Sequence, residues 1–349
     1  MLSIELKKTY YGALIDKNPE YDGIFYVGIK STGVFCRSVC PARKPKFENC
    51  EFYATAAEAL LAGFRPCRRC RPVSHPDEVP EVVRKLVQAV EEQPEKRRKE
   101  ADFRKLSTSA AQASRLFKKR FGMIFVAYAR ARRLGLALKQ IKEHRAVINA
   151  QIDFGYDSGS GFRDAFSKIM GAPPAKSKEV NLLKADWIDT PLGPMITIAD
   201  ERALYLLEFV NRRGLEREIQ RLRDKLKSAI IPGKTEIIDS IEQELNRYFK
   251  GELEQFFTPI MMIGTLFQKR VWLELKKIPI GKTLSYSDIA KKLDNAGAVR
   301  AVGSANGANQ LAIIIPCHRV INADGQLGGY GGGLARKKWL LEHEAKYGK

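Results

Sequence analysis

Apolar positions in the middle of the chain recur with the spacing of helices. From Val79 to Val90 they fall three or four residues apart, which predicts a helix. The hydroxyls of Ser107-Thr108-Ser109 are typical of a helix start, and a second helix is predicted from Ala110 to Phe121 with Gly122 as its stop. A longer helix, rich in Ala, Leu and Arg, is predicted from Phe125 to Ile141. This part of the chain is therefore expected to hold three helices, with a strongly charged region from Glu91 to Arg104 after the first.

A second helical unit is predicted after the long helix. Val147 to Phe154 predicts a short helix, Gly155 to Ser158 a turn, and Gly161 to Met170 another helix that ends at Gly171. Two pairs of short helices joined by a long helix predict an all-α double helix-turn-helix domain, in which each unit places its second helix in a major groove of DNA. The alternative is a basic helical bundle that merely connects two domains.

The pattern changes after a proline-rich linker from Pro173 to Lys178. Residues 186–263 alternate short apolar strand candidates, Met195 to Ala199 and Leu204 to Val210, with charged helical stretches such as Leu215 to Lys227. The chain of 349 residues therefore predicts a multidomain α+β protein.

Positive charge is concentrated in one part of this chain. The formal net charge is +20, and residues 96–145 hold sixteen Lys and Arg against Glu100, Asp102 and Glu143. A basic block interrupted by helical apolar positions is typical of a surface that neutralises phosphates, so nucleic acid is the expected partner. The alternative is a solvated basic surface without a partner.

The sequence predicts neither a membrane span nor a secretory signal peptide. No apolar run approaches the length of a membrane span, and residues 1–5 lack a signal-peptide pattern. We expect a cytoplasmic, nucleoid-associated protein in a reducing compartment, where six cysteines do not form a disulfide framework.

Four of the six cysteines have the spacing of a zinc site. C-x3-C is followed, twenty-six residues later, by C-x2-C, and these cysteines are Cys36, Cys40, Cys67 and Cys70. Two close pairs of thiolates on separate turns predict one tetrahedral Zn²⁺ site. Four unrelated thiols are the alternative, and the surplus Cys50 is interpreted as a small packing residue.

A cysteine and a histidine stand next to each other at the end of an aliphatic run. The segment Ile315-Pro316-Cys317-His318-Arg319-Val320 follows Leu311. A thiol is a strong nucleophile only as a thiolate, and an adjacent imidazole can take up its proton. By itself, such a pair is usually a buried thiol beside a structural histidine.

The hexapeptide from Ile315 to Val320 resembles the active-site segment of the O6-alkylguanine-DNA alkyltransferases. The resemblance implies a ribonuclease-H-like lobe at residues 184–263 and a helical, winged-helix-like catalytic lobe at residues 264–349. It implies irreversible transfer of a methyl group from O6-methylguanine or O4-methylthymine to Cys317. Each molecule would react once, because a thioether is a poor leaving group.

Further segments match the same family and carry implied roles. His318 would be the base and would act through a water. Glu344, in the segment Leu340–Glu344, would orient His318. Glu342 is the competing candidate for this role and is interpreted as an exposed charge on a helix. The remaining implied roles concern extrusion and binding of the base. They fall on Tyr286 for phosphate rotation, Arg300 for filling the space of the flipped base, Asn309 for tying the turn together, and Tyr330 and Gly331 for the alkyl pocket.

Gly33 to Arg43 and Gly63 to Pro72 resemble the metal-binding methyl-acceptor domain of Ada-type proteins, which would span residues 1–77. The resemblance implies that Cys36 accepts a methyl group from a methyl phosphotriester, that Cys40, Cys67 and Cys70 are ligands only, and that Arg43 contacts DNA. One Zn²⁺ and no organic cofactor are expected. A zinc with four thiolates carries a charge of roughly −2, so methylation of one sulfur would strengthen attraction to DNA.

Residues 115–122 and 154–166 resemble the AraC-type DNA-binding domain, which would span residues 80–175. The first unit lacks the usual glycine in its turn, Arg104 to Ser107. Expected DNA contacts from the two units and from the catalytic lobe are Arg115, Lys118, Lys119, Ser158, Ser160, Arg163 and Arg300.

The order of these three resemblances predicts an Ada-type protein that repairs methylated DNA and regulates transcription. Its expected partners are methylated double-stranded DNA, promoter DNA and RNA polymerase, and it is expected to be monomeric. Two alternatives remain. One is a repair alkyltransferase whose amino-terminal half only binds DNA, and the other is a zinc-containing regulator with an inert Cys317.

Overall fold

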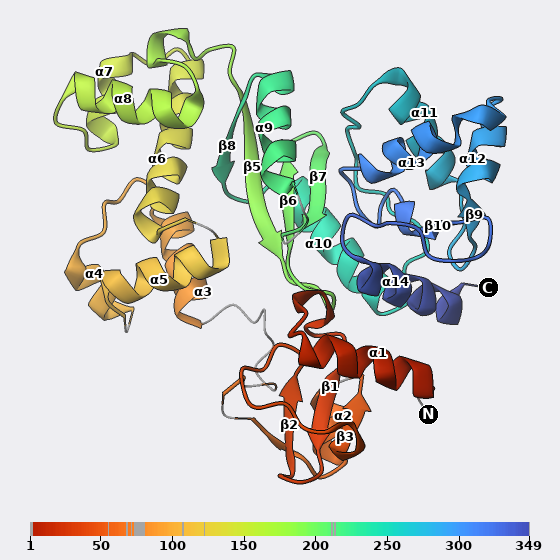
Figure 1. The fold of residues 1–349 in the computed structure, drawn as a ribbon. Coiled ribbons are helices and arrows are strands. Elements are labelled where there is room, and N and C mark those ends of the chain that lie inside the picture. Colours follow the sequence, from red (N-terminus) through yellow and green to blue (C-terminus); the bar gives the residue numbers. More distant parts are fainter. Residues whose placement is uncertain are drawn as a thin grey trace.

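The computed structural model describes residues 3–54, 56–67, 69–70, 72, 81–106, 108–121, 123–210, 212 and 214–348. Figure 1 shows three parts: an amino-terminal domain in red and orange, a helical region whose colour runs from light orange through yellow to yellow-green, and a larger carboxy-terminal α+β part in green and blue. The predicted capping residue Ser107, the predicted helix stop Gly122 and the predicted domain boundary between residues 77 and 80 lie outside the described residues. None of the helices among the described residues is long and apolar enough to cross a membrane.

The amino-terminal domain is a small sheet with helices beside it. Its strands are β1 (Tyr26–Ile29), β2 (Val34–Arg37), β3 (Cys50–Tyr53) and β4 (Arg65–Pro66), in the order β3-β1-β2-β4, and its helices are α1 (Ile4–Ile15) and α2 (Ala56–Leu61). The centre of the sheet packs through Phe25, Val27 and Phe35, all fully buried. Strand β4 pairs with β2 in parallel, so both strands end at the same edge.

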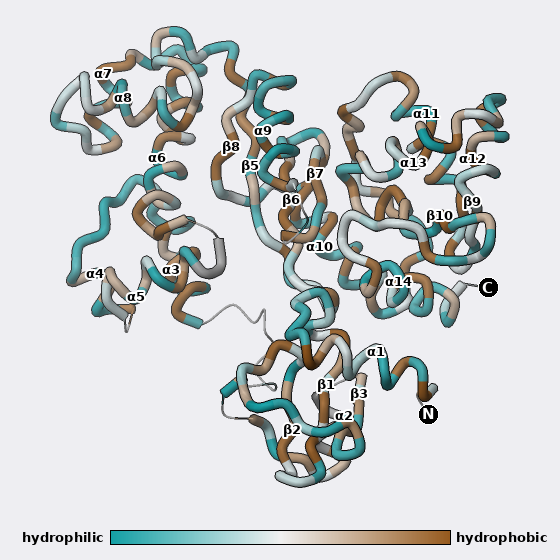
Figure 2. The backbone as a smooth tube through the Cα atoms, in the orientation of Figure 1, coloured by the Kyte–Doolittle hydropathy of each residue, from teal (hydrophilic) through white to brown (hydrophobic). Residues whose placement is uncertain are grey.

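The helical region contains six helices among the described residues. They are α3 (Glu81–Glu92), α4 (Glu100–Lys105), α5 (Ala110–Phe121), α6 (Phe125–Lys142), α7 (Val147–Asp153) and α8 (Gly159–Met170). The structure confirms the predicted helices to within two residues at each described end. Helix α8 begins two residues before the predicted Gly161, because the side chain of Ser158 caps it. Helix α4 was not predicted, since it follows a strongly hydrophilic segment that separates it from α3 (Figure 2).

The carboxy-terminal part begins with a mixed four-stranded sheet. Its strands are β5 (Asn181–Ile188), β6 (Met195–Ala199), β7 (Leu204–Phe209) and β8 (Ser228–Pro232), in the order β7-β6-β5-β8, with helices α9 (Leu215–Leu226) and α10 (Glu236–Phe249). The two predicted strands are β6 and β7, so this part of the prediction is confirmed. Strands β5 and β8 and helix α10 were not predicted.

A helical lobe follows the sheet and shares its core. Its helices are α11 (Leu266–Lys276), α12 (Tyr286–Lys292), α13 (Val299–Gly307) and α14 (Leu334–Tyr347), and its two short strands are β9 (Leu284–Ser285) and β10 (Val320–Ile321). One cluster of buried side chains joins Phe209 and Leu207 of the sheet with Trp272, Val302 and Leu340 of the lobe. The two lobes therefore fold as one unit.

The helical region also packs against the sheet. Ala229 and Ile231 of β8 lie in one apolar cluster with Leu138 of α6 and Phe166 of α8. A β-carbon at Gly135 would overlap the side chain of Ile231, so glycine allows α6 to approach β8 closely. The predicted linker from Pro173 to Lys178 is partly a 3-10 turn, Pro174–Lys176, rather than a loose connection.

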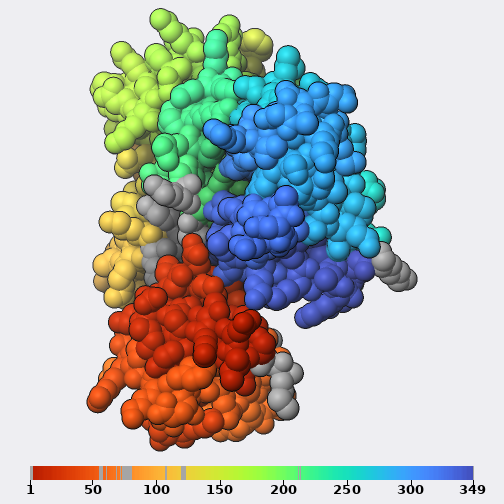
Figure 3. Space-filling model, turned by 45° about the vertical axis from the view of Figure 1, so that its right-hand side comes forward, coloured from red at the N-terminus to blue at the C-terminus, as the bar shows by residue number. Residues whose placement is uncertain are grey.

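The amino-terminal domain lies beside the carboxy-terminal helix (Figure 3). The short 3-10 turn Pro19–Tyr21 contacts α14, and Glu20 lies against Gly333 at the start of that helix. The amino-terminal domain is therefore in direct contact with the lobe that carries Cys317.

Candidate active site and metal centre

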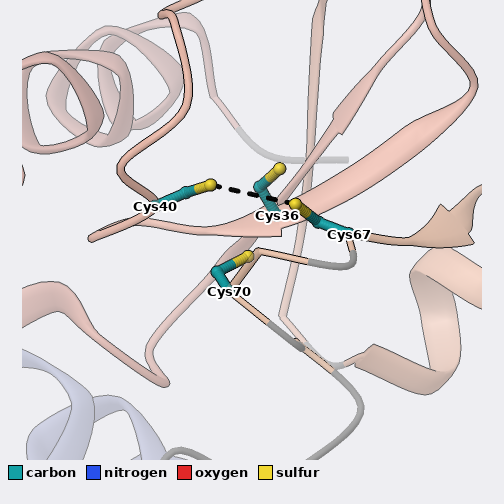
Figure 4. Close-up of side chains that lie close together, drawn as sticks. All are labelled: Cys36, Cys40, Cys67 and Cys70. Atoms are coloured by element: carbon teal, nitrogen blue, oxygen red, sulfur yellow. Dashed lines mark hydrogen bonds between the residues drawn. The ribbon is translucent and has the colours of Figure 1, made fainter.

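The four amino-terminal thiols meet at one edge of the small sheet (Figure 4). Cys36 lies on β2 and Cys67 follows β4, and the backbone N–H of Cys67 donates to the carbonyl of Phe35 at 3.0 Å. Cys40 and Cys70 each follow three or four residues later on the turn beyond their strand. The parallel pairing of β2 and β4 therefore brings the two pairs together.

The positions of the sulfur atoms fit tetrahedral coordination of one metal ion. All four Sγ atoms lie within 4.8 Å of one another, and those of Cys40 and Cys67 are 4.0 Å apart. Zinc–sulfur bonds of ~2.3 Å place the sulfurs of a tetrahedral site about 3.8 Å apart. The Sγ atom of Cys70 also accepts the backbone N–H of Arg37 at 3.4 Å. These residues can therefore hold one Zn²⁺ with little rearrangement.

Charged residues surround this cluster on the amino-terminal domain. Arg37 pairs with Asp22, and Lys44 donates to the carbonyl of Cys40 at 3.0 Å. Arg43, a predicted DNA contact, is exposed. Cys50 stands outside the cluster, and its sulfur donates to the carbonyl of Lys46 at 3.3 Å.

Cys317 lies on a sharply turned segment between the aliphatic run and β10. Ile313 has φ of 71°, a left-handed conformation that is costly for a β-branched residue, and the N–H of Ile314 donates to the carbonyl of Ala312 at 2.9 Å. A second tight turn places the N–H of Cys317 2.7 Å from the carbonyl of Ile315. Strain of this kind persists only where the surroundings hold the backbone in place.

Asn309 holds this turn through its side chain. Its amide nitrogen lies 2.8 Å from the carbonyl of Ile315 and 3.1 Å from Cys317 Sγ, and its oxygen accepts the N–H of Leu311 at 3.0 Å. Asn306 on α13 adds a hydrogen bond of 3.3 Å to the carbonyl of Cys317. The backbone around the thiol is therefore fixed by two asparagine amides.

His318 forms a buried pair with Glu344. Its Nε2 lies 2.8 Å from Glu344 Oε1, and both residues are at most 1% exposed. Arg319 donates to both oxygens of the same carboxylate, at 2.8 and 2.9 Å, and the hydroxyl of Tyr248 donates to Oε1 at 2.7 Å. Glu342, the competing carboxylate, is exposed and pairs with Lys338.

This arrangement sets the protonation states of the pair. Burial lowers the pKa of His318, although Glu344 acts against it. Burial by itself raises the pKa of Glu344, but hydrogen bonds and charge from His318 and Arg319 outweigh it and lower this pKa well below its usual range. The resting pair is therefore a neutral imidazole held by a carboxylate. Its other ring nitrogen, Nδ1, is buried and has no hydrogen-bond partner among the described residues.

The thiol itself is protonated at rest. Burial raises the pKa of Cys317 to about 11, while the hydrogen bond from Asn309 acts in the opposite direction. The buried ammonium of Lys337 favours the thiolate through its charge, and burial lowers its own pKa to about 8. A proton acceptor is therefore needed when Cys317 reacts.

A pocket of about 450 Å³ opens onto the thiol. Its lining brings together Cys317, Tyr286, Tyr330 and Gly331 of the predicted site, with small residues of α13 and the loop before α14. A β-carbon at Gly328 would lie 2.9 Å from the hydroxyl oxygen of Tyr286, so glycine keeps room beside this tyrosine. Arg300 is exposed at the start of α13 and does not line the pocket.

Several buried residues of this site were not predicted from the sequence. Arg212, which follows β7, lines the pocket and donates to the carbonyls of Gly307 and Asn309 at 2.8 and 3.0 Å. It also pairs with Glu208 at 2.9 Å. Lys337 and Tyr248 belong to this set as well. Arg319, which pairs with Glu344, was not predicted either. It is the only one of these residues that the sequence could have indicated, because it lies inside the hexapeptide from Ile315 to Val320.

The predicted DNA contacts of the helical region are exposed where they are described. Arg115 and Lys118 lie on α5, and Ser160 and Arg163 on α8. Ser158 is exposed and also has a structural role, because its Oγ accepts the N–H of Gly161 at 3.1 Å. The side chain of Lys119 lies outside the described residues.

Three family models match the chain in succession. Residues 9–73 match the metal binding domain of Ada, residues 103–179 match a helix-turn-helix domain, and residues 266–346 match the DNA binding domain of 6-O-methylguanine DNA methyltransferase. The two matches at the ends contain the four clustered cysteines and Cys317, respectively.

Curated relatives extend over nearly the whole chain. The bifunctional transcriptional activator/DNA repair enzyme Ada of Escherichia coli strain K12 is 35% identical over 348 residues, which cover 96% of this chain and 95% of that protein. The regulatory protein ada of Salmonella typhimurium is 33% identical over 357 residues and covers 93% of both chains. The methylated-DNA–protein-cysteine methyltransferase of Mycobacterium tuberculosis strain H37Rv is 45% identical over 157 residues, which cover 45% of this chain and 89% of that protein.

Proposed function

We propose that this chain, which belongs to the Ada family of bifunctional DNA repair enzymes and transcriptional activators, uses Cys317 and Cys36 as its two methyl acceptors. The protein repairs methylated DNA by transferring methyl groups to cysteine, and it activates transcription. The observation that carries the assignment of Cys317 is a thiol at a pocket, beside a buried His318–Glu344 pair.

Transfer to Cys317 is an in-line displacement at carbon. The sulfur–carbon bond forms while the bond between the methyl carbon and O6 of guanine (or O4 of thymine) breaks. The thiol proton passes to Nδ1 of His318 through a water, and Glu344 stabilises the imidazolium that results. The proton then reaches the departing base, whose charge is relieved by a hydrogen bond from Tyr286. The product is a thioether. Its thiolate is too poor a leaving group to be displaced from the methyl carbon, so the thiol is not restored.

Access to the methyl group requires the base to leave the stack. Helix α13 carries Ala301, Gly303 and Ser304, whose small side chains allow a close approach to the minor groove. Arg300 is exposed at the start of this helix and would fill the space of the extruded base. Tyr286 faces the pocket and helps to rotate the nucleotide into it. Tyr330 and Gly331 line the space for the alkyl group.

The four-thiol cluster holds one Zn²⁺ through Cys36, Cys40, Cys67 and Cys70. A bound zinc ion keeps cysteine sulfurs as thiolates at neutral pH, which preserves one of them as a nucleophile. The choice of Cys36 as the acceptor rests on the resemblance of residues 33–43 to the Ada-type motif. Burial does not favour it, since Cys36 is 3% exposed whereas Cys70 is half-buried.

Charge connects the modification of Cys36 to DNA binding. The unmodified zinc cluster carries roughly −2 and repels phosphates, whereas one methylated sulfur removes about one negative charge. Arg43, α5 and α8 present positive charge for the same DNA. Methylation therefore raises affinity for promoter DNA, and RNA polymerase is the expected partner of the bound form.

The proposed domains are residues 1–77, 80–175, 184–263 and 264–349. The first boundary falls in residues 73–80, outside the described part of the chain. The third and fourth are one folded unit with a common core, made of a ribonuclease-H-like lobe and a winged-helix-like helical lobe. We infer a monomer, located in the cytoplasm with the nucleoid.

The experiment that tests the regulatory half is a titration of the DNA upstream of the protein's own gene against methylated and unmethylated protein at two salt concentrations. Methylated protein is expected to bind more tightly. The gain is expected to shrink as salt rises, because exposed charges are screened within about 8 Å at physiological ionic strength. Equal affinities of the two forms would contradict signalling through Cys36.

A further inference from the structure

A second pocket lies between the two helix-turn-helix units. It has a volume of about 440 Å³, within the range of small-molecule sites, and four of its lining residues are arginines: Arg97, Arg98, Arg130 and Arg133. Arg97 and Arg98 come from the segment between α3 and α4 of the first unit. Tyr156 comes from the turn of the second unit, and Gly161 and Ala165 from α8. The pocket therefore has walls from both units and from α6, which joins them.

The lining of this pocket is positively charged. None of the described residues that line it is acidic, and none of the four arginines forms an ion pair with a described carboxylate. Arg98 is partly used, since its guanidinium donates to the carbonyls of Ala89, Lys96 and Gln93. Arg97 stacks over the ring of Tyr156 at 5.0 Å. Arg97, Arg130 and Arg133 thus leave most of their donors for another molecule.

Arg133 is the unusual member of this set. It is 6% exposed, and its Nε is buried without a hydrogen-bond partner among the described residues. The hydroxyl of Tyr156 is likewise buried and has no such partner. Burial lowers the pKa of Arg133 most, Tyr156 opposes this effect, and the charges of Arg97 and Arg130 add to it. A guanidinium stays protonated in such a place, and leaving it unpaired costs free energy that an anion would recover.

We propose that this pocket binds a phosphate group through Arg97, Arg130 and Arg133, with the Tyr156 hydroxyl as a further donor. Guanidinium groups match the geometry of phosphate oxygens and bind them with two hydrogen bonds each. The volume exceeds that of a lone phosphate, so a phosphate that carries a sugar or another small alcohol fits as well. The phosphate belongs either to a free phosphorylated small molecule or to the backbone of bound DNA.

Such a ligand would connect the two DNA-binding units. Arg97 precedes α4 in the first unit, Arg130 and Arg133 lie on α6, and Tyr156 stands just before α8. A phosphate held by all of them restricts the relative movement of α5 and α8, whose spacing must suit two successive major grooves. By linkage, a free ligand that favours this spacing would raise the affinity for DNA, and DNA would raise the affinity for the ligand.

The test is titration of the full-length, zinc-loaded protein with inorganic phosphate and with ribose 5-phosphate by calorimetry, with chloride holding the ionic strength constant. Wild-type protein is expected to bind one ligand per chain. Arg97→Gln and Arg130→Gln remove exposed guanidinium groups and should each weaken binding about tenfold. Lys139→Gln is the matched control, because Lys139 is exposed on the same helix, α6, outside the pocket. It should leave binding unchanged.

A second arm identifies the source of the phosphate. A duplex of unrelated sequence is titrated at several salt concentrations with wild-type protein, Arg130→Gln and Lys139→Gln, with and without ribose 5-phosphate. Competition with the duplex, and a salt slope smaller by about 0.9 in Arg130→Gln alone, would assign the pocket to a backbone phosphate. Unchanged or tighter duplex binding in the presence of ribose 5-phosphate would assign it to a free phosphorylated molecule.

Two results would overturn the proposal. One is the absence of saturable binding of both phosphate probes by wild-type protein, together with an unchanged salt slope in Arg130→Gln. The other is an equal loss in Lys139→Gln and Arg130→Gln, which would show that only the general positive charge of α6 matters. Arg133→Gln should also weaken binding of both phosphate probes, and this variant is used provided that thermal unfolding shows an intact fold.

Discussion

The two proposed methyl-acceptor centres would make a thiol reactive in different ways. The amino-terminal centre gathers four sulfurs at the edge of a small sheet, and three of them are part of its buried cluster. The carboxy-terminal centre places one sulfur in a large core that spans two lobes. Around Cys317 the protein supplies Asn309, His318 and Glu344, each fixed by buried hydrogen bonds. The first site depends on a metal, whereas the second depends on the packing of the fold.

The stability of the two domains has different sources. The amino-terminal sheet has short strands of two to four residues, so the metal must supply much of what a core would otherwise contribute. The carboxy-terminal site is held by a core with Trp272, Phe209 and Tyr248 fully buried or nearly so. Loss of a sulfur should therefore unfold the first site and leave the second one folded.

The largest expected effect is that of Cys67→Ala. Loss of one ligand should release the zinc and unfold the amino-terminal domain, because metal binding contributes on the order of 10 kcal/mol in small zinc domains. Zinc analysis and circular dichroism check this. Cys50→Ala is the matched control, since Cys50 lies in the same domain but outside the cluster. Retention of stoichiometric zinc and of the fold in Cys67→Ala would show that the domain does not depend on a four-thiolate metal site.

A smaller effect is expected at the base-extrusion residues. Arg300→Ala and Tyr286→Phe should slow repair of duplex DNA about tenfold to a hundredfold, because extrusion costs a few kcal/mol that these residues offset. Reaction with free O6-benzylguanine, which needs no extrusion, should slow far less. Single-turnover rates on both substrates provide the measurement. Equal losses on both would mean that the two residues serve the pocket or the fold.

The stability of the site around Cys317 is expected to depend on pH. The pKa of His318 is lowered in the fold, so the unfolded chain takes up a proton at this residue first as pH falls below about 6.5. The lowered pKa of Glu344 acts in the same direction below about 4.3. Both groups therefore lose stabilising free energy on acidification.

Methyl transfer to Cys317 should follow the same groups. The rate is expected to stay level down to pH 6.5 and to fall at lower pH, when His318 becomes protonated and can no longer accept the thiol proton. Glu344→Gln removes a partner that raises the pKa of His318, so the fall should move to still lower pH while the plateau rate drops. Denaturant unfolding must be followed in parallel. A rate that falls with the usual histidine pKa in both proteins would contradict the buried pair.

Much of the fold could be predicted because its signals are local. The helices α5 to α8 have regular apolar spacing, and capping serines stand at the starts of α5 and α8. Strands β6 and β7 are short apolar runs. Strands β5 and β8 were missed, because their pairing depends on distant parts of the chain. The close contact of Gly135 with Ile231 likewise joins segments that no local pattern connects.

The candidate site divides in the same way. The cysteine spacing and the hexapeptide are local patterns, and the comparisons confirm the family and the zinc site that they predicted. The roles of Tyr286, Arg300, Glu344 and Cys36 stay predictions. Arg212 and Lys337 could not have been found from the sequence, because a buried arginine or lysine has no pattern that differs from an exposed one.

The most direct test of two separate acceptors is the intact mass of the zinc-loaded protein after incubation with methylated DNA, followed by peptide mapping. DNA with O6-methylguanine should add one methyl group at Cys317, and DNA with methyl phosphotriesters should add one at Cys36. Cys317→Ala should abolish the first transfer and leave the second unchanged. Several repaired lesions per molecule, or a methyl group from O6-methylguanine on any other residue, would contradict the account.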